Sequence, residues 1–185
     1  RAVQYLRTVT PLPSGDIMGY MPAAVSGAFG AKVITVFHHN SEKGLPSHQG
    51  SVLLFDGETG TLQAMLDGGA ITEIRTGAAS LLARPDAEVL ALIGSGAQAR
   101  SHLLAIREIR KLREVRVWSP SLESDTRFAR EMGELTGLPV RICASAKEAA
   151  EGADILCTLT PSKTPVLERE WLKPGAHVNA VGACS

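Results

Sequence analysis

The sequence has few aromatic residues and no excess charge of either sign. Its 185 residues include 19 basic and 19 acidic side chains, and only 4% are aromatic. Nucleic acids and anionic membranes are bound by basic surfaces, so this balance disfavours both as partners. The 44% of hydrophobic residues instead indicates a soluble, globular protein.

Cysteine is scarce, and long apolar runs are lacking. Cys143, Cys157 and Cys184 are odd in number and form no C-x-x-C pair, which argues against a disulfide framework and against a zinc site. We therefore expect free or buried thiols and no metal. The sequence has neither an apolar run of about 20 residues nor an opening signal peptide, so we expect a cytoplasmic protein.

Both ends of the sequence are abrupt. It begins at Arg1 without an initiator methionine and stops at Ser185, just past an apolar, strand-like run. We expect a fragment of a longer protein.

From Glu88 onward, apolar runs alternate with helical patterns. The runs typical of buried strands are EVLALIG, VRVWS, PVRIC, DILCTLT and HVNAVG. Between them, segments such as AQARSHLLAIREIRKL and SLESDTRFAREMGELTG have helical spacing, and EREWLKPG continues the alternation. Strands connected by helices form parallel sheets. Residues 85–185 are thus predicted to be a Rossmann-type, doubly wound α/β domain that lacks its C-terminal part.

Residues 1–84 have a different pattern. Strand-like pieces are separated by Pro and Gly turns, GETG is typical of a hairpin, and a helix is expected from about Thr72 through Ala83. The segment ARPDAE, with Pro85, marks the expected boundary. The predicted fold class is α/β, with this incomplete α+β domain preceding the parallel sheet.

The run EVLALIG leads into a glycine motif. Gly94, Gly96 and Ala99 fit the G-x-G-x-x-G/A fingerprint, in which glycines permit a tight turn and a close approach of pyrophosphate to the start of a helix. The loop comprises Gly94, Ser95, Gly96, Ala97 and Gln98. A purely structural turn is the alternative, but the position after a strand and before a helix favours a dinucleotide site.

The end of the second strand of this domain bears on the choice of dinucleotide. NAD enzymes commonly place an acid there to bind the ribose, yet this chain has Ser119, Pro120 and Ser121, with no acid until Glu123. No arginine is present in the loop either. Because the hydroxyls of Ser119 and Ser121 can contact a phosphate, the sequence weakly favours NADP(H) over NAD(H).

Several motifs in order resemble the ornithine cyclodeaminase and mu-crystallin family. They are EIRTGAASLLA, ALIGSGAQARSHLLAI, EGADILCTLT and WLKPGAHVNAVGA, while GYMPA and PSHQGSVLLFDGETGTLQAMLDG are closer to the mu-crystallin branch. The resemblance covers essentially the whole chain, and members of the family are longer at both ends. It implies a Rossmann domain joined to a substrate-binding and dimerisation domain, a homodimer, and hydride exchange between a nicotinamide and a carbon–nitrogen double bond.

The resemblance also assigns roles to residues. Arg7 and Lys32 match basic residues that bind the substrate carboxylate and orient it for catalysis, and Arg75 matches a residue near both carboxylate and cofactor. Ser47 and His48 match a pair on the nicotinamide side. The remaining matches to cofactor-binding positions are Gly94 through Gln98, Ser119, Ser121, Thr158, Leu159, Thr160, Val181 and Cys184. Arg7 and Lys32 as ordinary surface charges, and His48 as a structural histidine, are the alternatives.

One position departs from the cyclodeaminase pattern. Cyclodeaminases have an aspartate after the fifth strand that resembles a catalytic base, whereas this chain has Val181, Gly182, Ala183 and Cys184 there. The resemblance then makes Cys184 a residue that contacts the substrate but cannot act as the carboxylate base. The resemblance thus implies an NAD(P)H-dependent reductase of cyclic ketimine carboxylates. The alternatives are ornithine cyclodeamination or reductive amination of a 2-oxo acid, and NADPH-dependent binding of an iodothyronine.

Overall fold

The computed structural model describes residues 1–72 and 83–182. Contacts divide the chain into two units, Arg1–Thr72 and Glu73–Ser185. The sequence places this boundary at residue 84. In the structure, Ala83 is buried in the core of the second unit and Arg84 hydrogen-bonds to Asp154 of the same unit.

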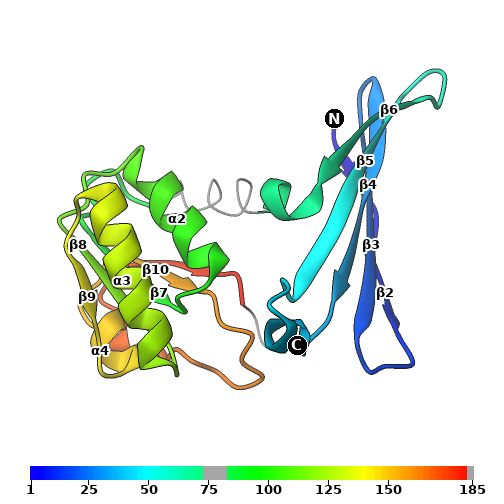
Figure 1. The fold of residues 1–185 in the computed structure, drawn as a ribbon. Helices are drawn as coiled ribbons and strands as arrows, with labels where there is room; N and C mark the ends of the chain where they lie inside the picture. The colour runs from blue at the N-terminus through cyan, green and yellow to red at the C-terminus, as the bar shows by residue number, and fades with distance from the viewer. Residues whose placement is uncertain (73–82, 183–185) are drawn as a thin grey trace. The chain divides into compact units, whose positions relative to one another are not determined.

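The first unit is an antiparallel sheet of six strands in the order β1-β3-β4-β5-β6, with β2 also paired to β3 (Figure 1). The bounds are β1 Val3–Gln4, β2 Thr8–Pro11, β3 Ile17–Val25, β4 Ala28–Val36, β5 His48–Asp56 and β6 Leu62–Asp67, with the 3-10 turn η1 at Asn40–Lys43. GETG connects β5 to β6, as predicted. After β6, residues 68–72 begin a helix.

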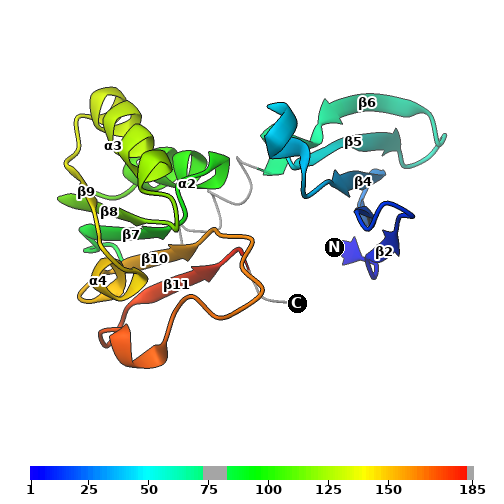
Figure 2. The same cartoon turned by 60° about the horizontal axis from the view of Figure 1, so that its bottom comes forward.

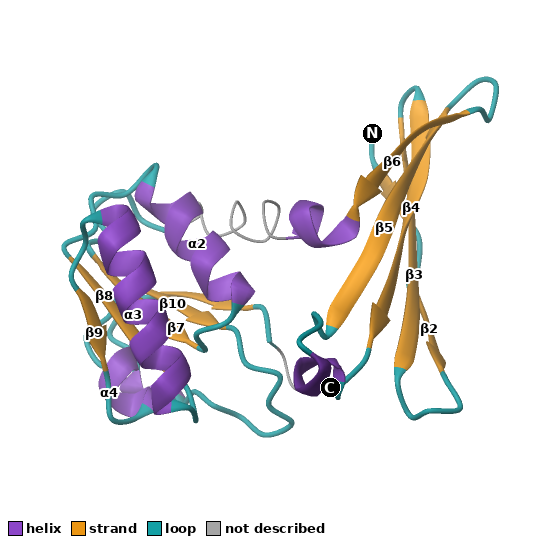
Figure 3. Cartoon of the chain, in the orientation of Figure 1, coloured by secondary structure: helices purple, strands orange, loops and turns teal. Residues whose placement is uncertain are grey.

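The second unit is a five-stranded parallel sheet in the order β11-β10-β7-β8-β9 (Figure 2). Helices connect its strands (Figure 3). Its elements in chain order are β7 Val89–Ile93, α2 Ala97–Arg107, β8 Glu114–Trp118, α3 Leu122–Thr136, β9 Val140–Ile142, α4 Ala146–Ala150, β10 Ile155–Thr158, η3 Arg169–Trp171 and β11 His177–Ala180. The predicted Rossmann-type sheet is confirmed, because the order reverses between β7 and β10 as in doubly wound folds.

Both faces of this sheet are covered (Figure 2). Leu90 and Leu92 of β7 pack with side chains of α2 and α3, whereas Val89 and Ala91 belong to a cluster that includes Ala150 of α4. All five residues of β7 are buried. A strand buried on both faces must be a continuous apolar run, which is why EVLALIG has no alternation.

The helices begin differently. The Ser121 side chain accepts a hydrogen bond from the Ser124 N–H at the start of α3, and Ser145 caps α4 in the same way. Gly96 is the N-cap of α2 and has no side chain to offer. The helical spacing predicted through Leu112 was too long, since α2 ends at Arg107. None of the described helices is long and apolar enough to cross a membrane.

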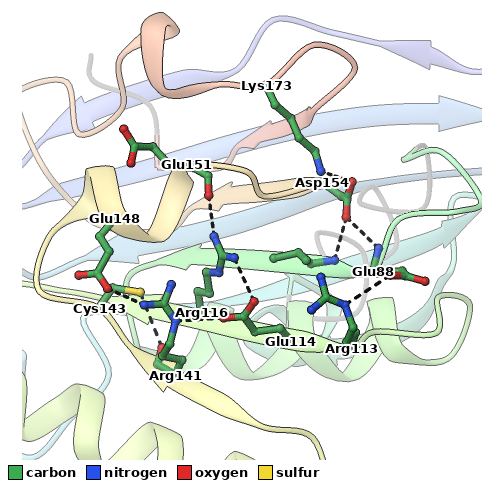
Figure 4. Close-up of polar contacts among 11 residues, drawn as sticks. Glu88, Arg113, Glu114, Arg116, Arg141, Cys143, Glu148, Glu151, Asp154 and Lys173 are labelled. Atoms are coloured by element: carbon green, nitrogen blue, oxygen red, sulfur yellow. Dashed lines mark hydrogen bonds and ion pairs between the residues drawn. The ribbon is translucent and has the colours of Figure 1, made fainter.

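The amino edge of the parallel sheet is held by Asp154 (Figure 4). This carboxylate accepts hydrogen bonds from the N–H groups of Glu88 (3.0 Å) and Val89 (2.9 Å), and it pairs with Lys173 (2.6 Å) and Arg84. Burial by itself would raise the pKa of the Asp154 carboxyl, but these partners outweigh burial and hold its pKa far below the usual range. Asp154 thus ties β7, β10 and the segment around Lys173 at the edge opposite the glycine loop.

Candidate functional site in the parallel sheet and on the antiparallel sheet

The carboxyl edge of the parallel sheet carries most of the predicted cofactor residues. β7 ends at Ile93 and its neighbour β10 ends at Thr158. These strands flank the point where the strand order reverses, and ligands of open α/β sheets bind outside the carboxyl ends at this point. The fold therefore brings Gly94 through Gln98 next to Thr158 through Thr160.

Gly94 is required by the chain itself. Its φ is +122°, a backbone conformation that L side chains rarely adopt, and a Cβ there would lie 3.0 Å from the carbonyl carbon of Leu159. Its N–H donates to the Trp118 carbonyl at 2.7 Å. A glycine at this position is explained by the turn alone.

Gly96 has no such explanation within the described chain. It has φ −82° and ψ −164°, which any residue adopts, and a Cβ built on it would meet nothing within 4 Å. The position opens on free space at the first turn of α2, where helix N–H groups and the helix dipole favour an anion. The residues present fit the pyrophosphate of a dinucleotide.

Two buried polar atoms point to the same conclusion. Gln98 Oε1 and Thr160 Oγ1 are buried and have no hydrogen-bond partner among the described residues. Buried polar groups are normally paired. Gln98 lies in the first turn of α2 and Thr160 lies just after β10, so both belong to the edge where the dinucleotide would bind.

The segment after β11 closes tightly on this edge. The Gly182 N–H donates to the Thr158 carbonyl at 2.7 Å, and a Cβ at Gly182 would overlap the Thr160 carbonyl oxygen. Val181 precedes it at the end of the fifth parallel strand. The described part of the Val181–Cys184 segment therefore lies where the sequence placed it, and Cys184 itself lies outside the described residues, as does Arg75.

The loop after β8 differs from the expectation. The Ser119 hydroxyl donates to Asp125 Oδ1 at 2.6 Å, the Ser119 N–H donates to Asp125 Oδ2 at 2.7 Å, and the Ser121 hydroxyl caps α3. Both hydroxyls proposed for a phosphate thus have bonds within the loop. Asp125, only 1% exposed, was missed because its partner lies six residues earlier, a spacing with no standard motif.

A hollow of about 350 Å³ lies beside this loop. Its walls include Trp118, Pro120, Thr160 and Val166, so it runs from the end of β8 to the segment after β10. Trp118 and Trp171 also pack against the buried cluster around Ile93. Mostly apolar walls with a few polar groups are typical of ligand sites.

The first unit contains the predicted substrate residues. Lys32 lies on β4, opposite Met21 of β3 and Val52 of β5. Its ammonium donates to Thr72 Oγ1 at 2.5 Å, and that hydroxyl donates to the Gly68 carbonyl at 2.5 Å. Since the Thr72 hydrogen is directed to Gly68, a lone pair of its oxygen faces Lys32, and Lys32 is held against the helix start that follows β6.

Arg7 is exposed and lies between β1 and β2, not within a strand as its sequence context indicated. The register still places it near Lys32 along the sheet, because the next residue, Thr8, pairs with Tyr20 of β3, and Lys32 pairs with Met21. One strand separates them, which at about 4.8 Å per strand spacing corresponds to roughly 10 Å between backbones. At this separation, the long side chains of Arg7 and Lys32 can both reach one small carboxylate.

Ser47 and His48 lie at the start of β5. The Ser47 hydroxyl and His48 Nδ1 are 3.0 Å apart, and His48 pairs with Val36 of β4. Lys32 and Val36 are four residues apart on one strand, so the side chains of His48 and Lys32 belong to the same face of the sheet. Desolvation by neighbouring atoms, and then the charges of His38 and Lys32, lower the pKa of the His48 imidazole. A neutral His48 imidazole is suited to contact the uncharged ring of a reduced nicotinamide.

Comparison with known proteins identifies the relatives of this chain. Residues 3–185 match the model of the ornithine cyclodeaminase/mu-crystallin family. The chain belongs to the ornithine cyclodeaminase/mu-crystallin family. The predicted resemblance is therefore confirmed, and so is the α/β fold that it implied.

Relatives within the ornithine cyclodeaminase/mu-crystallin family include enzymes of imine chemistry. The chain is 42% identical over 190 residues to ketimine reductase mu-crystallin of Rattus norvegicus, covering 98% of this chain and 59% of the relative. It is 35% identical to the structure of Thermococcus litoralis Delta(1)-pyrroline-2-carboxylate reductase in complex with NADH and L-proline, with a TM-score of 0.88 over 96% of this chain and 57% of that one. An archaeal alanine dehydrogenase dimer with bound NAD is 32% identical, with a TM-score of 0.87 over 98% of this chain and 57% of that one.

The chain thus spans about three fifths of the length of these members of the ornithine cyclodeaminase/mu-crystallin family. The described residues of this family member assemble the cofactor edge in one unit, and Arg7, Lys32, Ser47 and His48 on one sheet in the other. Asp125 and the contact of Thr72 with Lys32 are the features that the sequence alone did not single out.

Proposed function

We propose that the protein containing this chain is an NAD(P)H-dependent reductase of cyclic ketimine carboxylates. Its substrates would be the five- and six-membered rings in which a carbon–nitrogen double bond is adjacent to a carboxylate. The similarity to ketimine reductase mu-crystallin and to a Delta(1)-pyrroline-2-carboxylate reductase supports this class of reaction.

The observation that carries the proposal is the open space at Gly96. A glycine with ordinary φ and ψ and with nothing within 4 Å of its Cβ position is explained by a ligand that approaches the backbone. The free first turn of α2 would hold the pyrophosphate, the unpartnered oxygens of Gln98 and Thr160 would bind donors of the cofactor, and the hollow beside Trp118 would take an adenine. A bound reduced nicotinamide supplies a hydride.

The residues of the antiparallel sheet would bind and orient the substrate. A cyclic ketimine carboxylate has one permanent negative charge, and Arg7 and Lys32 offer it two cations. Thr72 holds the Lys32 ammonium in place. Fixing the carboxylate orients the ring relative to the nicotinamide. Holding the two reactants in the right geometry lowers the barrier of the hydride transfer. The imine nitrogen is already protonated when it reacts, so the step requires no strong base at the position of Cys184.

The experiment uses the full-length protein, NADH or NADPH, and each of the two cyclic ketimine carboxylates. Oxidation of the cofactor is followed by its absorbance, and formation of the cyclic amino acid is followed by chromatography. We expect stoichiometric formation of the amine. A protein that binds the cofactor but turns over neither ring would refute the proposed activity.

Reductive amination of a 2-oxo acid is a second candidate, because the archaeal alanine dehydrogenase is similar over 98% of the chain. It differs from the first candidate in requiring ammonia. Cofactor oxidation with a 2-oxo acid only when ammonium is added would favour it. Ornithine cyclodeamination would instead release ammonia, and the lack of an acid at Cys184 disfavours it.

The remaining expectations stay predictions. The argument for NADP(H) over NAD(H) depends on Ser119 and Ser121, and their bonds within the loop weaken it. Binding of an iodothyronine would use the same Arg7 contact and would occur without turnover. A homodimer and a cytoplasmic location also stay predictions, the first to be tested by sedimentation of the full-length protein.

A further inference from the structure

A buried carboxylate lies in the loop that follows β8. The carboxyl end of the second strand of a Rossmann sheet holds the adenosine ribose, and here that end is Trp118 followed by Ser119. We infer that Asp125 makes this site select NAD(H) against NADP(H), acting through Ser119. The inference rests on the proposed dinucleotide binding, and it reverses the cofactor preference expected from the sequence.

Asp125 uses both of its carboxylate oxygens on one residue. Oδ2 accepts the Ser119 N–H at 2.7 Å and Oδ1 accepts the Ser119 hydroxyl at 2.6 Å. Ser119 has only these two donors. A phosphate is a strong acceptor and needs donors, so Ser119 can serve a phosphate only by giving up a charge-assisted bond to Asp125.

The acceptor side of the Ser119 hydroxyl is in use as well. It lies 3.2 Å from the Ser121 N–H and 3.3 Å from the Ser95 hydroxyl, both of which donate to it. Ser95 belongs to the glycine loop, so these contacts link the loop after β8 to the pyrophosphate site. The neutral ribose 2′-OH of NAD(H) can donate and accept, and it can join such a network without bringing charge.

The charges around the loop favour a neutral group. The 2′-phosphate of NADP(H) is an anion, and at Ser119 it would lie next to the Asp125 carboxylate, which is 1% exposed and therefore weakly screened. From Trp118 through Thr126 the sequence has no lysine or arginine, and the first cation after the loop is the exposed Arg127 on α3. The buried Asp125 carboxylate is therefore the charge in direct contact with Ser119.

Arg100, a cation on α2 near the glycine loop, already has partners. The Arg100 guanidinium donates to the Ser95 carbonyl at 3.1 Å and to Glu131 Oε2 at 2.5 Å, and it lies over the Phe128 ring at 5.6 Å. Its charge is paired with Glu131 on α3. Arg100 therefore stabilises the packing of α2 on α3, and recruiting it to a phosphate would break that pairing.

The test compares binding of NADH and NADPH to the full-length protein by fluorescence titration. The variant is Asp125→Asn, which keeps the shape but removes the charge. Its single amide oxygen can accept only one of the two hydrogen bonds from Ser119, and its NH2 group can only donate to the Ser119 hydroxyl, so a Ser119 donor is freed for a phosphate. The matched control is Glu123→Gln, which removes one carboxylate from the same helix start at an exposed position. Thermal unfolding of each variant shows whether it is folded.

We expect the unmodified protein to bind NADH about tenfold or more tightly than NADPH, because like charges brought together disfavour a ligand strongly. Asp125→Asn should tighten NADPH binding and leave NADH binding nearly unchanged, and Glu123→Gln should keep the original ratio. Equal or tighter binding of NADPH by the unmodified protein would overturn the inference even if Asp125→Asn does not fold. A ratio that is unchanged in folded Asp125→Asn would overturn the role of Asp125. A protein that binds neither cofactor refutes the proposed function itself, whereas NADPH preference with active imine reduction refutes only the selectivity.

Discussion

Replacing Gly96 by alanine should strongly weaken cofactor binding and spare the fold. The backbone at Gly96 has φ −82° and ψ −164°, and the added methyl would meet nothing within 4 Å. Alanine is a poorer N-cap than glycine by roughly 0.5–1 kcal/mol, but it also lowers the entropy of the unfolded chain, which stabilises the folded state by about 0.4–1 kcal/mol. The two effects nearly cancel, so the free energy of unfolding should change by less than about 0.5 kcal/mol.

The effect on binding follows from the space that the methyl would occupy. If the pyrophosphate approaches the backbone at Gly96, the methyl must displace it or distort the loop. Forcing a methyl group into an occupied, well-packed space costs about 1–3 kcal/mol, and lost N–H contacts of the α2 start add to this. At 1.4 kcal/mol per factor of ten, we expect cofactor affinity to fall by about a hundredfold.

Gly94→Ala is the matched comparison, and it should behave in the opposite way. Its φ of +122° is strained for alanine, and its Cβ would lie 3.0 Å from the Leu159 carbonyl carbon. Backbone strain of about 1–2 kcal/mol plus a clash of about 1–3 kcal/mol predicts a loss of roughly 2–5 kcal/mol in unfolding free energy. The assays are denaturant unfolding and fluorescence titration of NADH for the full-length forms of both variants.

Two results would show this reasoning to be wrong. Unchanged NADH affinity in Gly96→Ala would mean that the open space is not where the cofactor lies. A large loss of stability in that variant, comparable with that of Gly94→Ala, would mean that the glycine serves the turn and that the alternative of a structural motif was correct.

Three further predictions concern stability and substrate binding. Asp154→Asn should lower the unfolding free energy by about 2–3 kcal/mol in denaturant titrations, because the partly exposed Lys173 and Arg84 lose the buried carboxylate that they share, whereas the exposed Asp86→Asn should change little; a loss below that of the control would contradict the role of Asp154. Burial lowers the pKa of His102, against the opposing effect of the bond to the Gln98 carbonyl, so the folded state keeps this imidazole neutral while the unfolded chain takes up a proton. The contribution of the neutral His102 to the free energy of unfolding is therefore present above a pH of about 6.5, and it decreases as the pH falls, by at most about 1.4 kcal/mol per pH unit. His102→Gln should flatten that part of the curve of unfolding free energy against pH. Lys32→Met should raise the KM for the cyclic ketimine by about ten- to a hundredfold with NADH affinity unchanged, and an unaltered KM would assign Lys32 to structure alone.

The sequence predicted the parallel sheet well because its signals are local. The strand of EVLALIG is buried on both faces, the helical spacing of SLESDTRFAREMGELTG coincides with α3, and the glycine loop is contiguous. Each of these patterns reflects the physics of a short segment.

Other features depend on residues far apart in the chain and gave no local signal. Asp154 binds the Glu88 and Val89 N–H groups, which are 66 and 65 residues away. Lys32 meets Thr72 across 40 residues. The engagement of Ser119 by Asp125 is close in sequence, but a helical acid typically interacts with its own helix start, and only the fold reveals that the carboxylate turns back to the strand. The contacts of Ala83 and Arg84 with the second unit are likewise tertiary and leave no local signal.

The start of α2 has a consequence for the stability of the whole second unit. α3 and α4 each close their first turn with a serine, whereas α2 begins at a glycine that can offer no side chain. A bound pyrophosphate would act as the missing N-cap, so the cofactor becomes a component of the helix as well as its ligand. Saturating cofactor at a hundred times its Kd would then add about 2.7 kcal/mol to the unfolding free energy. Protection of the amides of Gln98 and Ala99 from hydrogen exchange would rise with it, because helix α2 would no longer fray from its first turn.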